Sequence, residues 1–231
     1  MKTTFQYLGH SCFLLETNGH KVLFDPFISG NPLSDAQKID IKSIMPNFIL
    51  ISHGHADHIL DAVTIAQQSG ATCVCSWEIH EWLQKQGVTN THPMNTGGFW
   101  NFPFGKVQAV IAHHSSGLPD GTYGGNPMGF VLSLADLTLY YSGDTALTLD
   151  MQLIPKRHNV DIAVLPIGSN FTMDIDDALT AAQFVQCKKV IPVHYDTFGF
   201  IVVDKEECII KAKKAGVELH FVGIRETISL S

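Results

Sequence analysis

Each half of the chain begins with short strands and then alternates strands with helices. In the first half, apolar segments at 12–16 and 22–24 flank the Asn-Gly pair at 18–19, which favours a β-hairpin. In the second half, the apolar segments 130–134 and 137–141 indicate another hairpin. Because both halves continue as strand–helix units, this order predicts an α/β protein with two packed sheets and helices on the outer faces.

The remaining elements follow from hydrophobic periodicity and from glycines at helix ends. A polar loop from Asp25 to Pro46 is long for a connection, and long ordered loops are often functional. Since no linker-like segment interrupts the pattern, residues 1–231 are expected to form a single domain. We expect further strands at 4–8, 48–51, 72–75, 107–112, 162–165, 190–193 and 218–222, and helices at 59–68, 77–86, 176–186 and 205–215.

A cluster of potential metal ligands directly follows the strand at 48–51, in the run His53-Gly54-His55-Ala56-Asp57-His58. Three imidazoles and a carboxylate match the ligands that zinc takes in proteins. His53 and His55 are two residues apart and can reach one metal from the same side. Asp57 and His58 are adjacent and must diverge, so they suit a second position. The run therefore predicts part of a metal site.

Two metal ions need more ligands than this run supplies, and three later segments could provide them. Each segment lies where a predicted strand gives way to a loop, which is where ligands gather in sheets of this kind. A site assembled from distant strand ends is favoured by their joint occurrence, although each segment alone is a weak signal. The segments are Ala112-His113-His114-Ser115-Ser116, Ser142-Gly143-Asp144-Thr145 and Pro192-Val193-His194-Tyr195.

These residues resemble the metallo-β-lactamase superfamily, whose hallmark is H-x-H-x-D-H followed in order by a His, an Asp and a His. The same order occurs here in the run at 53–58, the pair at 113–114, Asp144 and His194. Finer features, such as Gly-His-Ser at 9–11, are similar to a compact branch of uncharacterised metal-dependent hydrolases related to ascorbate-6-phosphate lactonases. The resemblance covers almost the whole chain. It implies a four-layer αβ/βα sandwich with two mixed sheets and a site in the cleft between the halves.

The resemblance also implies a set of ligands for each of two metal ions. The first ion takes His53, His55 and a third histidine. His114 is preferred to His113 for this place because the matching histidine of the family directly precedes Ser-Ser. Neighbouring strand residues point to opposite faces, so only one of the two should line the site.

The second ion takes Asp57, His58 and His194, and Asp144 bridges both ions according to the same resemblance. Two divalent ions can share a bridging water and lower its pKa, so that the hydroxide becomes the nucleophile. Asp57 could also orient this hydroxide. We therefore expect Asp57 and Asp144 to be catalytic residues as well as metal ligands.

Zinc is the default metal for a histidine-rich site that also contains carboxylates. Manganese and iron are alternatives because carboxylates also suit harder ions. A further carboxylate would favour iron redox chemistry, but His58 occupies that place in the motif. Hydrolysis of an ester, lactone or phosphoester bond of a small substrate is therefore the favoured function. Phosphodiesterase or nuclease-type activity is one alternative, and a non-catalytic metal-binding sensor or scaffold is another.

Several residues near the motifs are candidates for supporting roles. His10 is predicted to contact the substrate or to orient a ligand, although a purely structural histidine is an equal alternative. Asn170 is a candidate substrate contact, with loop ordering as its alternative. Asp25, next to Pro26, is interpreted as a carboxylate that orients a ligating histidine or supports the fold.

Aromatic residues near the motifs could form an apolar wall of the cleft, although such residues more often belong to the core. Tyr195 is included among the candidate substrate-binding residues. The three predicted pocket-forming loops, at 31–42, 118–127 and 198–202, carry no decisive charge pattern. The four candidates for the wall are Phe27, Phe171, Tyr195 and Phe198.

Composition limits the classes of partner. The formal net charge is −7 and the one basic cluster is short, which disfavours binding of extended nucleic acid. No apolar run approaches the length of a membrane span, and the N-terminus does not resemble a signal peptide, so we expect a cytoplasmic location and no membrane partner. The five cysteines include no C-x-x-C pair, which disfavours a disulfide framework. Homo-oligomerisation is plausible, and the expected partner is a small-molecule substrate.

Overall fold

The computed structural model describes residues 2–230, which form two seven-stranded mixed sheets. The first sheet carries the N-terminal half and the last strand. Its strands β14, β1, β2 and β3 are antiparallel neighbours, whereas β3, β4, β5 and β6 run parallel. In spatial order the strands are β14 (Thr227–Ser229), β1 (Thr4–Gly9), β2 (Cys12–Thr17), β3 (His20–Phe24), β4 (Phe48–Leu50), β5 (Thr72–Cys75) and β6 (Thr91–Pro93).

The second sheet is built in the same way from the second half of the chain. Strands β7 to β10 are antiparallel neighbours, and strands β10 to β13 run parallel. In spatial order the strands are β13 (Glu218–Leu219), β12 (Lys189–Val193), β11 (Ile162–Pro166), β10 (Thr138–Tyr141), β9 (Met128–Ser133), β8 (Gly105–Ile111) and β7 (Phe99–Phe102).

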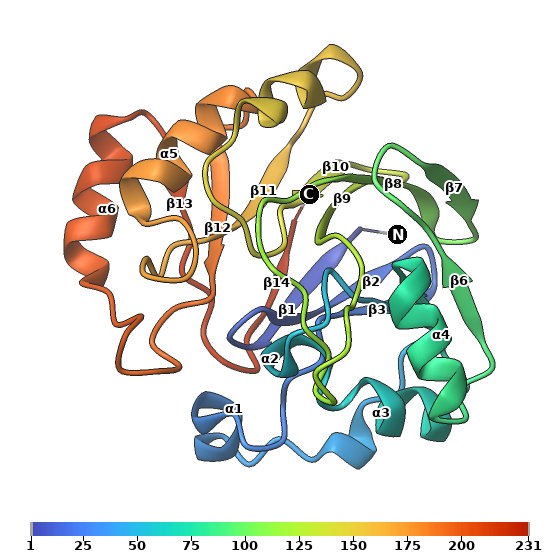
Figure 1. Cartoon of the computed structure of the whole chain (residues 1–231). Helices are drawn as coiled ribbons and strands as arrows, with labels where there is room; N and C mark the ends of the chain where they lie inside the picture. Colours follow the sequence, from blue (N-terminus) through green and yellow to red (C-terminus); the bar gives the residue numbers. More distant parts are fainter. Residues whose placement is uncertain (1, 231) are drawn as a thin grey trace.

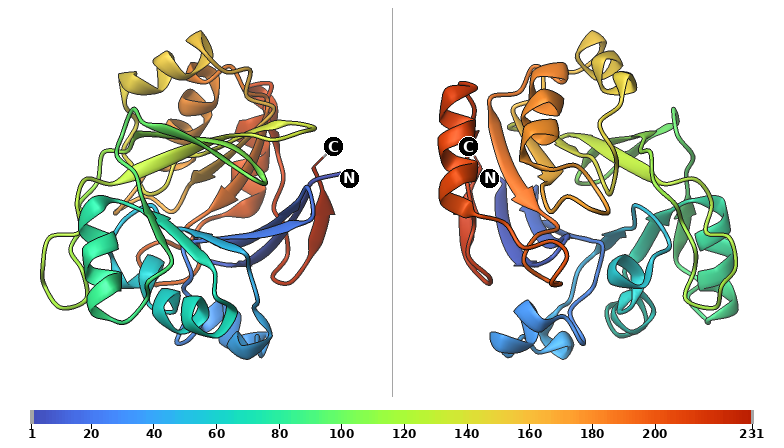
Figure 2. Two further views of the ribbon diagram at one scale, coloured as in Figure 1. Left: turned by 90° about the vertical axis from the view of Figure 1, so that its right-hand side faces the viewer. Right: turned by 60° about the vertical axis from the view of Figure 1, so that its left-hand side comes forward.

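Helices cover the outer faces, so the sheets form the two inner layers of a sandwich (Figures 1 and 2). This arrangement confirms the predicted four-layer α/β fold. None of the helices among residues 2–230 has the length and apolar character that crossing a membrane requires. The helices are α1 (Pro32–Ala36), η1 (Ile41–Ser43), α2 (Ala56–Ile59), α3 (Ala62–Ser69), α4 (Trp77–Lys85), η2 (Leu149–Lys156), α5 (Ile175–Phe184) and α6 (Lys205–Lys214).

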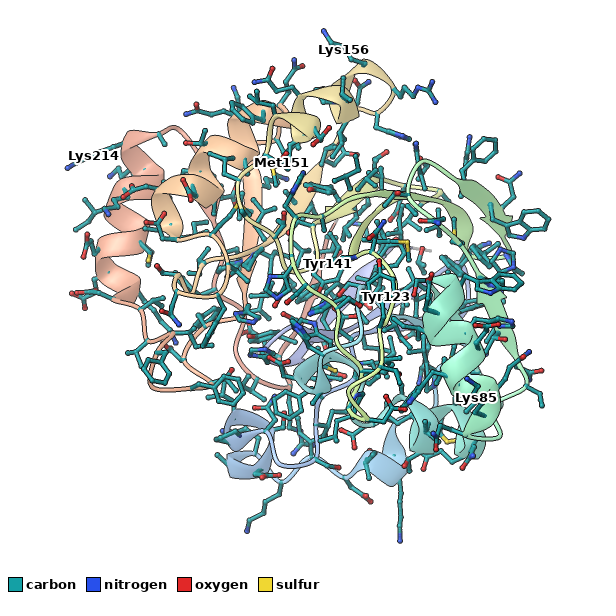
Figure 3. The ribbon with its side chains drawn as sticks, viewed as in Figure 1. Lys85, Tyr123, Tyr141, Met151, Lys156 and Lys214 are labelled. Atoms are coloured by element: carbon teal, nitrogen blue, oxygen red, sulfur yellow. The ribbon has the colours of Figure 1, made fainter. Side chains whose placement is uncertain are left out.

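Aromatic packing joins the two sheets. The rings of Phe13 and Phe24 stack with centroids 4.3 Å apart, and Tyr141 of the second sheet meets both edge-on at 5.2 and 5.6 Å. Tyr141 lies near the centre of the molecule, whereas Lys156 and Lys214 point outward (Figure 3). Offset and edge-on ring pairs of this kind add to the free energy gained by burial. The packing therefore holds the ends of β4, β8, β10 and β12 in fixed relative positions.

The structure differs from the sequence-based expectations mainly in short elements. The helix expected at 59–68 is divided into α2 and α3, because the buried Asp61 between them accepts hydrogen bonds from the amides of Ile28 and Ser29. The strand expected at 218–222 has only the two residues of β13. Strands β6, β7 and β14 were not expected, since they are too short to show a clear alternation. All five cysteines are buried and free.

Candidate metal centre

Strand ends bring the predicted ligands together on one edge of the sandwich. The run at 53–58 begins three residues after the end of β4, and its second half forms the short helix α2. His114 follows β8, Asp144 follows β10, and His194 directly follows β12. Because these strands belong to both sheets, the cluster forms only when the sheets pack. Every residue that the sequence predicted as a metal ligand lies in this cluster.

The first group of ligands contains His53, His55 and His114, which could hold one metal ion. Nε2 of His53 lies 3.0 Å from Nδ1 of His55. Burial lowers the pKa of the fully buried His53 well below its usual value, so the ring is neutral and has a free lone pair. Burial also lowers the pKa of His55 and His114. These neutral rings match what zinc requires of histidine.

The tautomer of His53 follows from its partners. Nδ1 of His53 lies 3.0 Å from Oγ of Ser52, and that hydroxyl donates its proton to Oδ2 of Asp25 at 2.6 Å. The ring must therefore donate from Nδ1 to the hydroxyl oxygen. This leaves Nε2 without a proton and directed at the neighbouring His55.

The second group contains His10, Asp57, His58 and His194. Oδ2 of Asp57 lies 3.9 Å from Nε2 of His194 and 4.0 Å from Nε2 of His58. These separations are too long for direct hydrogen bonds. They leave room between the three side chains for an additional atom that all of them could contact.

Asp144 lies between the two groups. Its Oδ2 atom is 3.2 Å from Nε2 of His58, 3.0 Å from Nε2 of His194 and 3.7 Å from Nε2 of His114. Among residues 2–230, Oδ1 of Asp144 and Nε2 of His58 are buried and make no hydrogen bond. Buried polar atoms without partners are costly, and a metal ion would satisfy Oδ1 of Asp144 directly and Nε2 of His58 once this nitrogen has lost its proton. The donor set therefore fits divalent metal ions.

Asp25 forms hydrogen bonds that hold residues of the cluster in place. Its carboxylate accepts hydrogen bonds from the amide and hydroxyl of Ser52, from Nδ1 of His58 at 2.8 Å and from the hydroxyl of Tyr141. Burial and the nearby Asp25 carboxylate raise the pKa of Tyr141, which keeps its hydroxyl a donor. A histidine that donates from one nitrogen in this way has its ring orientation fixed. The geometry fits the orienting role predicted for Asp25.

Two opposing effects set the charge of His58. Burial lowers its pKa, but the carboxylates of Asp144 and Asp25 outweigh burial and raise the pKa well above its usual value. The ring is therefore protonated at neutral pH while no metal is bound. Asp144 shows the reverse balance: burial raises its pKa, and His194 and His58 together hold it well below the usual range.

His10 is fully buried and contacts Asp57. Burial lowers its pKa to about 4, so the ring is neutral. Its Nε2 lies 3.1 Å from Oδ2 of Asp57, and its Nδ1 lies 2.9 Å from Oγ1 of Thr197. Since an ionised carboxylate only accepts, Nε2 carries the proton and Thr197 donates to Nδ1. The ring is thus placed to orient Asp57.

A hydrogen bond between two residues with a strained backbone joins the loops that carry His10 and His194. The amide of His194 donates to the carbonyl of His10 at 2.9 Å. Both residues have a left-handed backbone, with φ of 57° and 55°. This conformation costs about 1–2 kcal/mol for a residue with a side chain. Such strain is found where the surrounding structure imposes a functional geometry.

The other predicted candidates lie outside the cluster. His113 is exposed, and its Nε2 lies 3.3 Å from Asp150. Asn170 is exposed on the loop after β11, in a left-handed conformation with φ of 55°. Tyr195 is buried, with its ring stacked on Tyr7 at 6.3 Å. The described residues that line the cleft include neither Asn170 nor Tyr195, so the structure does not place these two predicted substrate contacts in it.

A cleft of about 790 Å³ opens over the ligands. Ser115, Thr197 and Phe200 line this cleft, but they were not among the predicted site residues. For Phe200, the only signal in the sequence was its place in a predicted pocket-forming loop. A second cavity of about 410 Å³ lies between β8 and η2, away from the histidine cluster. The cleft is lined by His55, Asp57, His114, Ser115, Asp144, Phe171, His194, Thr197, Phe198, Gly199 and Phe200.

Comparison with known proteins agrees with this geometry. Residues 4–194 match the model of the family described as the beta-lactamase superfamily domain. The chain belongs to the metallo-β-lactamase superfamily. The match spans β1 to His194, and so covers every predicted metal ligand of this superfamily member.

Relatives within the superfamily match all or nearly all of the chain. A protein of Flavobacterium johnsoniae named UPF0173 metal-dependent hydrolase is 49% identical over 230 residues, covering 100% of both chains. A protein of the same name from Methylacidiphilum infernorum is 48% identical, covering 97% of this chain and 98% of its own.

A solved structure has the same architecture. Igni18, described as a novel metallo hydrolase from the archaeon Ignicoccus hospitalis, superposes with a TM-score of 0.88 at 32% identity. The alignment covers 99% of this chain and 98% of Igni18. These comparisons confirm the predicted superfamily, its fold and its class of metal-dependent hydrolase.

Proposed function

We propose that this protein uses a dinuclear metal centre, with zinc as the favoured ion, to hydrolyse an ester, lactone or phosphoester bond of a small substrate. The position of Asp144 supports this proposal most strongly. One of its oxygens lies within 4 Å of histidines from both ligand groups. The other is buried without a partner among the described residues. A carboxylate in this position is suited to bridging two ions.

The proposed ligand sets follow the two groups. His53, His55 and His114 hold one ion, and Asp57, His58 and His194 hold the other. Histidine nitrogens predominate over carboxylates in this set, which favours zinc over manganese, and zinc is the usual ion of such sites. When bound, two such ions act as a Lewis acid and lower the pKa of water towards about 7.

The protein side chains position the reactants. Asp57 remains partly exposed to the cleft, and its pKa is lowered because the contact with His10 and the charge of His58 outweigh burial. It is therefore ionised and able to accept a hydrogen bond from a water molecule in the cleft. His10 prevents the carboxylate from rotating away.

The test combines metal analysis with a substrate panel. Metal-free protein is reloaded with zinc, manganese or iron(II), and bound metal is measured by mass spectrometry. Hydrolysis is then measured with methyl acetate, γ-butyrolactone and bis(4-nitrophenyl) phosphate. We expect about two zinc ions per chain and turnover of at least one bond type.

The variant Asp144→Asn tests the proposed ligand set. His113→Ala, which changes an exposed histidine, is its control. Asp144→Asn should lose metal and turnover together, while His113→Ala should keep both. Tight binding of two ions without turnover of any substrate would instead support a binding protein. Full metal content and full rate in Asp144→Asn would overturn the proposed ligand set.

A further inference from the structure

Three exposed phenylalanines line the cleft. Phe171 lies on the loop between β11 and α5, and Phe198 and Phe200 lie on the loop between β12 and α6. Their exposed fractions are 51%, 36% and 77%. Exposed aromatic side chains gathered around one opening commonly mark a binding site. Both loops begin at strand ends next to the proposed metal centre.

Phe198 is anchored beside the ligands. Its ring lies 5.5 Å from the ring of His10, which holds Asp57, and 6.3 Å from the ring of the buried Phe27. The ring of Phe171 meets that of Phe200 edge-on at 6.3 Å, which joins the two loops. Phe198 thus forms an inner wall, and the pair of Phe171 and Phe200 forms the outer rim.

The loop that carries Phe198 and Phe200 is preformed by its own hydrogen bonds. The amide of Asp196 donates to the carbonyl of Ile201 at 2.8 Å, and the amide of Ile201 donates to the carbonyl of Phe198 at 3.0 Å. The side chain of Ile201 is fully buried beneath the loop. Because little backbone freedom remains to be lost, apolar contacts made by the two rings contribute more fully to binding.

Charge in the cleft is restricted to the proposed ligands. Among the described residues that line it, the carboxylates are Asp57 and Asp144, and no lysine or arginine is present. Lys205, near the end of the same loop, pairs with Asp196 at 3.1 Å and lies over the ring of Tyr195. Phosphorylated ligands are usually held by arginine or lysine side chains or by helix N-termini. Apart from the proposed metal ions, a phosphate group would find no cation among these residues.

We infer that the substrate is a neutral carboxylic ester or lactone whose aromatic or branched aliphatic group packs against Phe171, Phe198 and Phe200. In the reaction, water adds to the acyl carbon and the acyl C–O bond breaks. The products are a carboxylate, an alcohol and a proton. Phe171 and Phe200 determine specificity, while the metal ligands determine turnover. This inference rests on the proposed hydrolase function and narrows it to carboxylic esters and lactones in preference to phosphoesters.

A binding experiment distinguishes the contribution of the aromatic rim to ligand affinity from that of the metal centre. Benzohydroxamate and acetohydroxamate carry the same metal-binding head and differ in the aromatic group. Their affinities for the zinc-loaded protein are measured by calorimetry. We expect benzohydroxamate to bind about tenfold more tightly, which is the usual effect of filling an apolar pocket. Phe171→Ala and Phe200→Ala should each reduce this preference severalfold, because the affinity for benzohydroxamate should fall more than that for acetohydroxamate.

Phe99→Ala is the matched control. Phe99 is 56% exposed, but it lies on the edge strand β7, remote from β11 and β12 in the sheet order. This variant should keep the preference for benzohydroxamate. Equal binding of the two hydroxamates by the wild-type protein would overturn the inference and leave the metal centre intact. Binding of neither hydroxamate to zinc-loaded protein would overturn the proposed function and the inference with it.

Turnover provides an independent check. Methyl phenylacetate and methyl acetate release the same alcohol, so their kcat/KM ratio reports binding of the phenyl group. We expect a ratio of about ten in the wild-type protein, falling towards one in Phe200→Ala. Phenyl phosphate, which carries the ring and a phosphate group, should be a poorer substrate than methyl phenylacetate. A preference for phenyl phosphate would overturn the inference.

Discussion

Nδ1 of His58 lies 2.8 Å from Oδ2 of Asp25, and both side chains are completely buried. The opposite nitrogen of the same ring, Nε2, lies 3.2 Å from Oδ2 of Asp144. Asp25 therefore fixes the orientation of the ring through one nitrogen, and Asp144 lies at the nitrogen that is proposed to bind metal. The affinity of the proposed metal site should therefore depend on Asp25, a residue outside the two proposed ligand sets.

Asp25→Asn is expected to weaken metal binding by about 10–100-fold, the usual effect of removing the partner of a ligating histidine. The amide keeps the shape of the side chain but loses the negative charge that fixes the His58 proton. Affinity is measured by competition with a chromophoric chelator. Asp61→Asn is the matched control, since Asp61 is also a buried hydrogen-bonding carboxylate but has no histidine partner among residues 2–230. Equal affinities in the two variants would contradict the orienting role.

We predict different effects on metal content for alanine substitutions at the neighbouring residues His113 and His114. His114→Ala should lower the bound zinc by about one equivalent, because one ion then keeps too few ligands for a tetrahedral site. His113→Ala should retain the full metal content, since its side chain is 58% exposed and pairs with Asp150. Metal analysis after dialysis distinguishes the two variants. Loss of zinc from His113→Ala alone would reverse the assignment.

Metal binding should release a proton near neutral pH. Burial lowers the pKa of His58, but Asp144 and Asp25 raise it further, so the ring is protonated in the metal-free protein. This proton stabilises the metal-free fold below the usual histidine pKa, and the stabilisation is lost as pH rises through the raised pKa. A metal ligand must be neutral, so metal affinity should rise about tenfold per pH unit below that raised pKa. Calorimetry in buffers of different ionisation enthalpy measures the release, and no proton release at about pH 7 would refute this charge state.

Gly168 is a steric requirement of the site. A Cβ atom added there would collide with the carbonyl oxygen of His194 and would lie 2.8 Å from Cβ of Ile201. Gly168→Ala should therefore lower the free energy of unfolding by about 1–3 kcal/mol and weaken metal binding at His194. Gly117→Ala should change stability by less than about 0.5 kcal/mol, since an added Cβ there meets no atom within 4 Å. Thermal unfolding and metal titration of both variants check this prediction.

The local motifs were the most predictable part of the site. In the run at 53–58, spacing and residue type alone indicate two diverging pairs of ligands, and both pairs lie in the cluster. The strands that precede Asp144 and His194 were predictable from their apolar runs. Short edge strands such as β6 and β14 were not, because three residues carry too little periodicity to distinguish a strand from a loop.

The supporting residues could not be predicted to the same degree. His10 had two possible functional roles and one structural role in the sequence, and the structure places it fully buried with Nε2 at 3.1 Å from Asp57. Of the four aromatic candidates for the cleft wall, Phe171 and Phe198 line the cleft, whereas Phe27 and Tyr195 are buried. Composition does not distinguish these cases, because an aromatic ring suits a core and a binding site equally.

The sequence by itself determined the order of ligands, the strand ends that carry them and the superfamily to which they belong. These features depend on residue type and local spacing. The tertiary structure decided that Asp25 holds His58, that His10 contacts Asp57, and that Phe200 joins the rim. Each of these contacts links segments far apart in the chain, and its distance is set by how the two sheets pack against each other. Packing of that kind is a property of the whole core and has no local signature in the sequence.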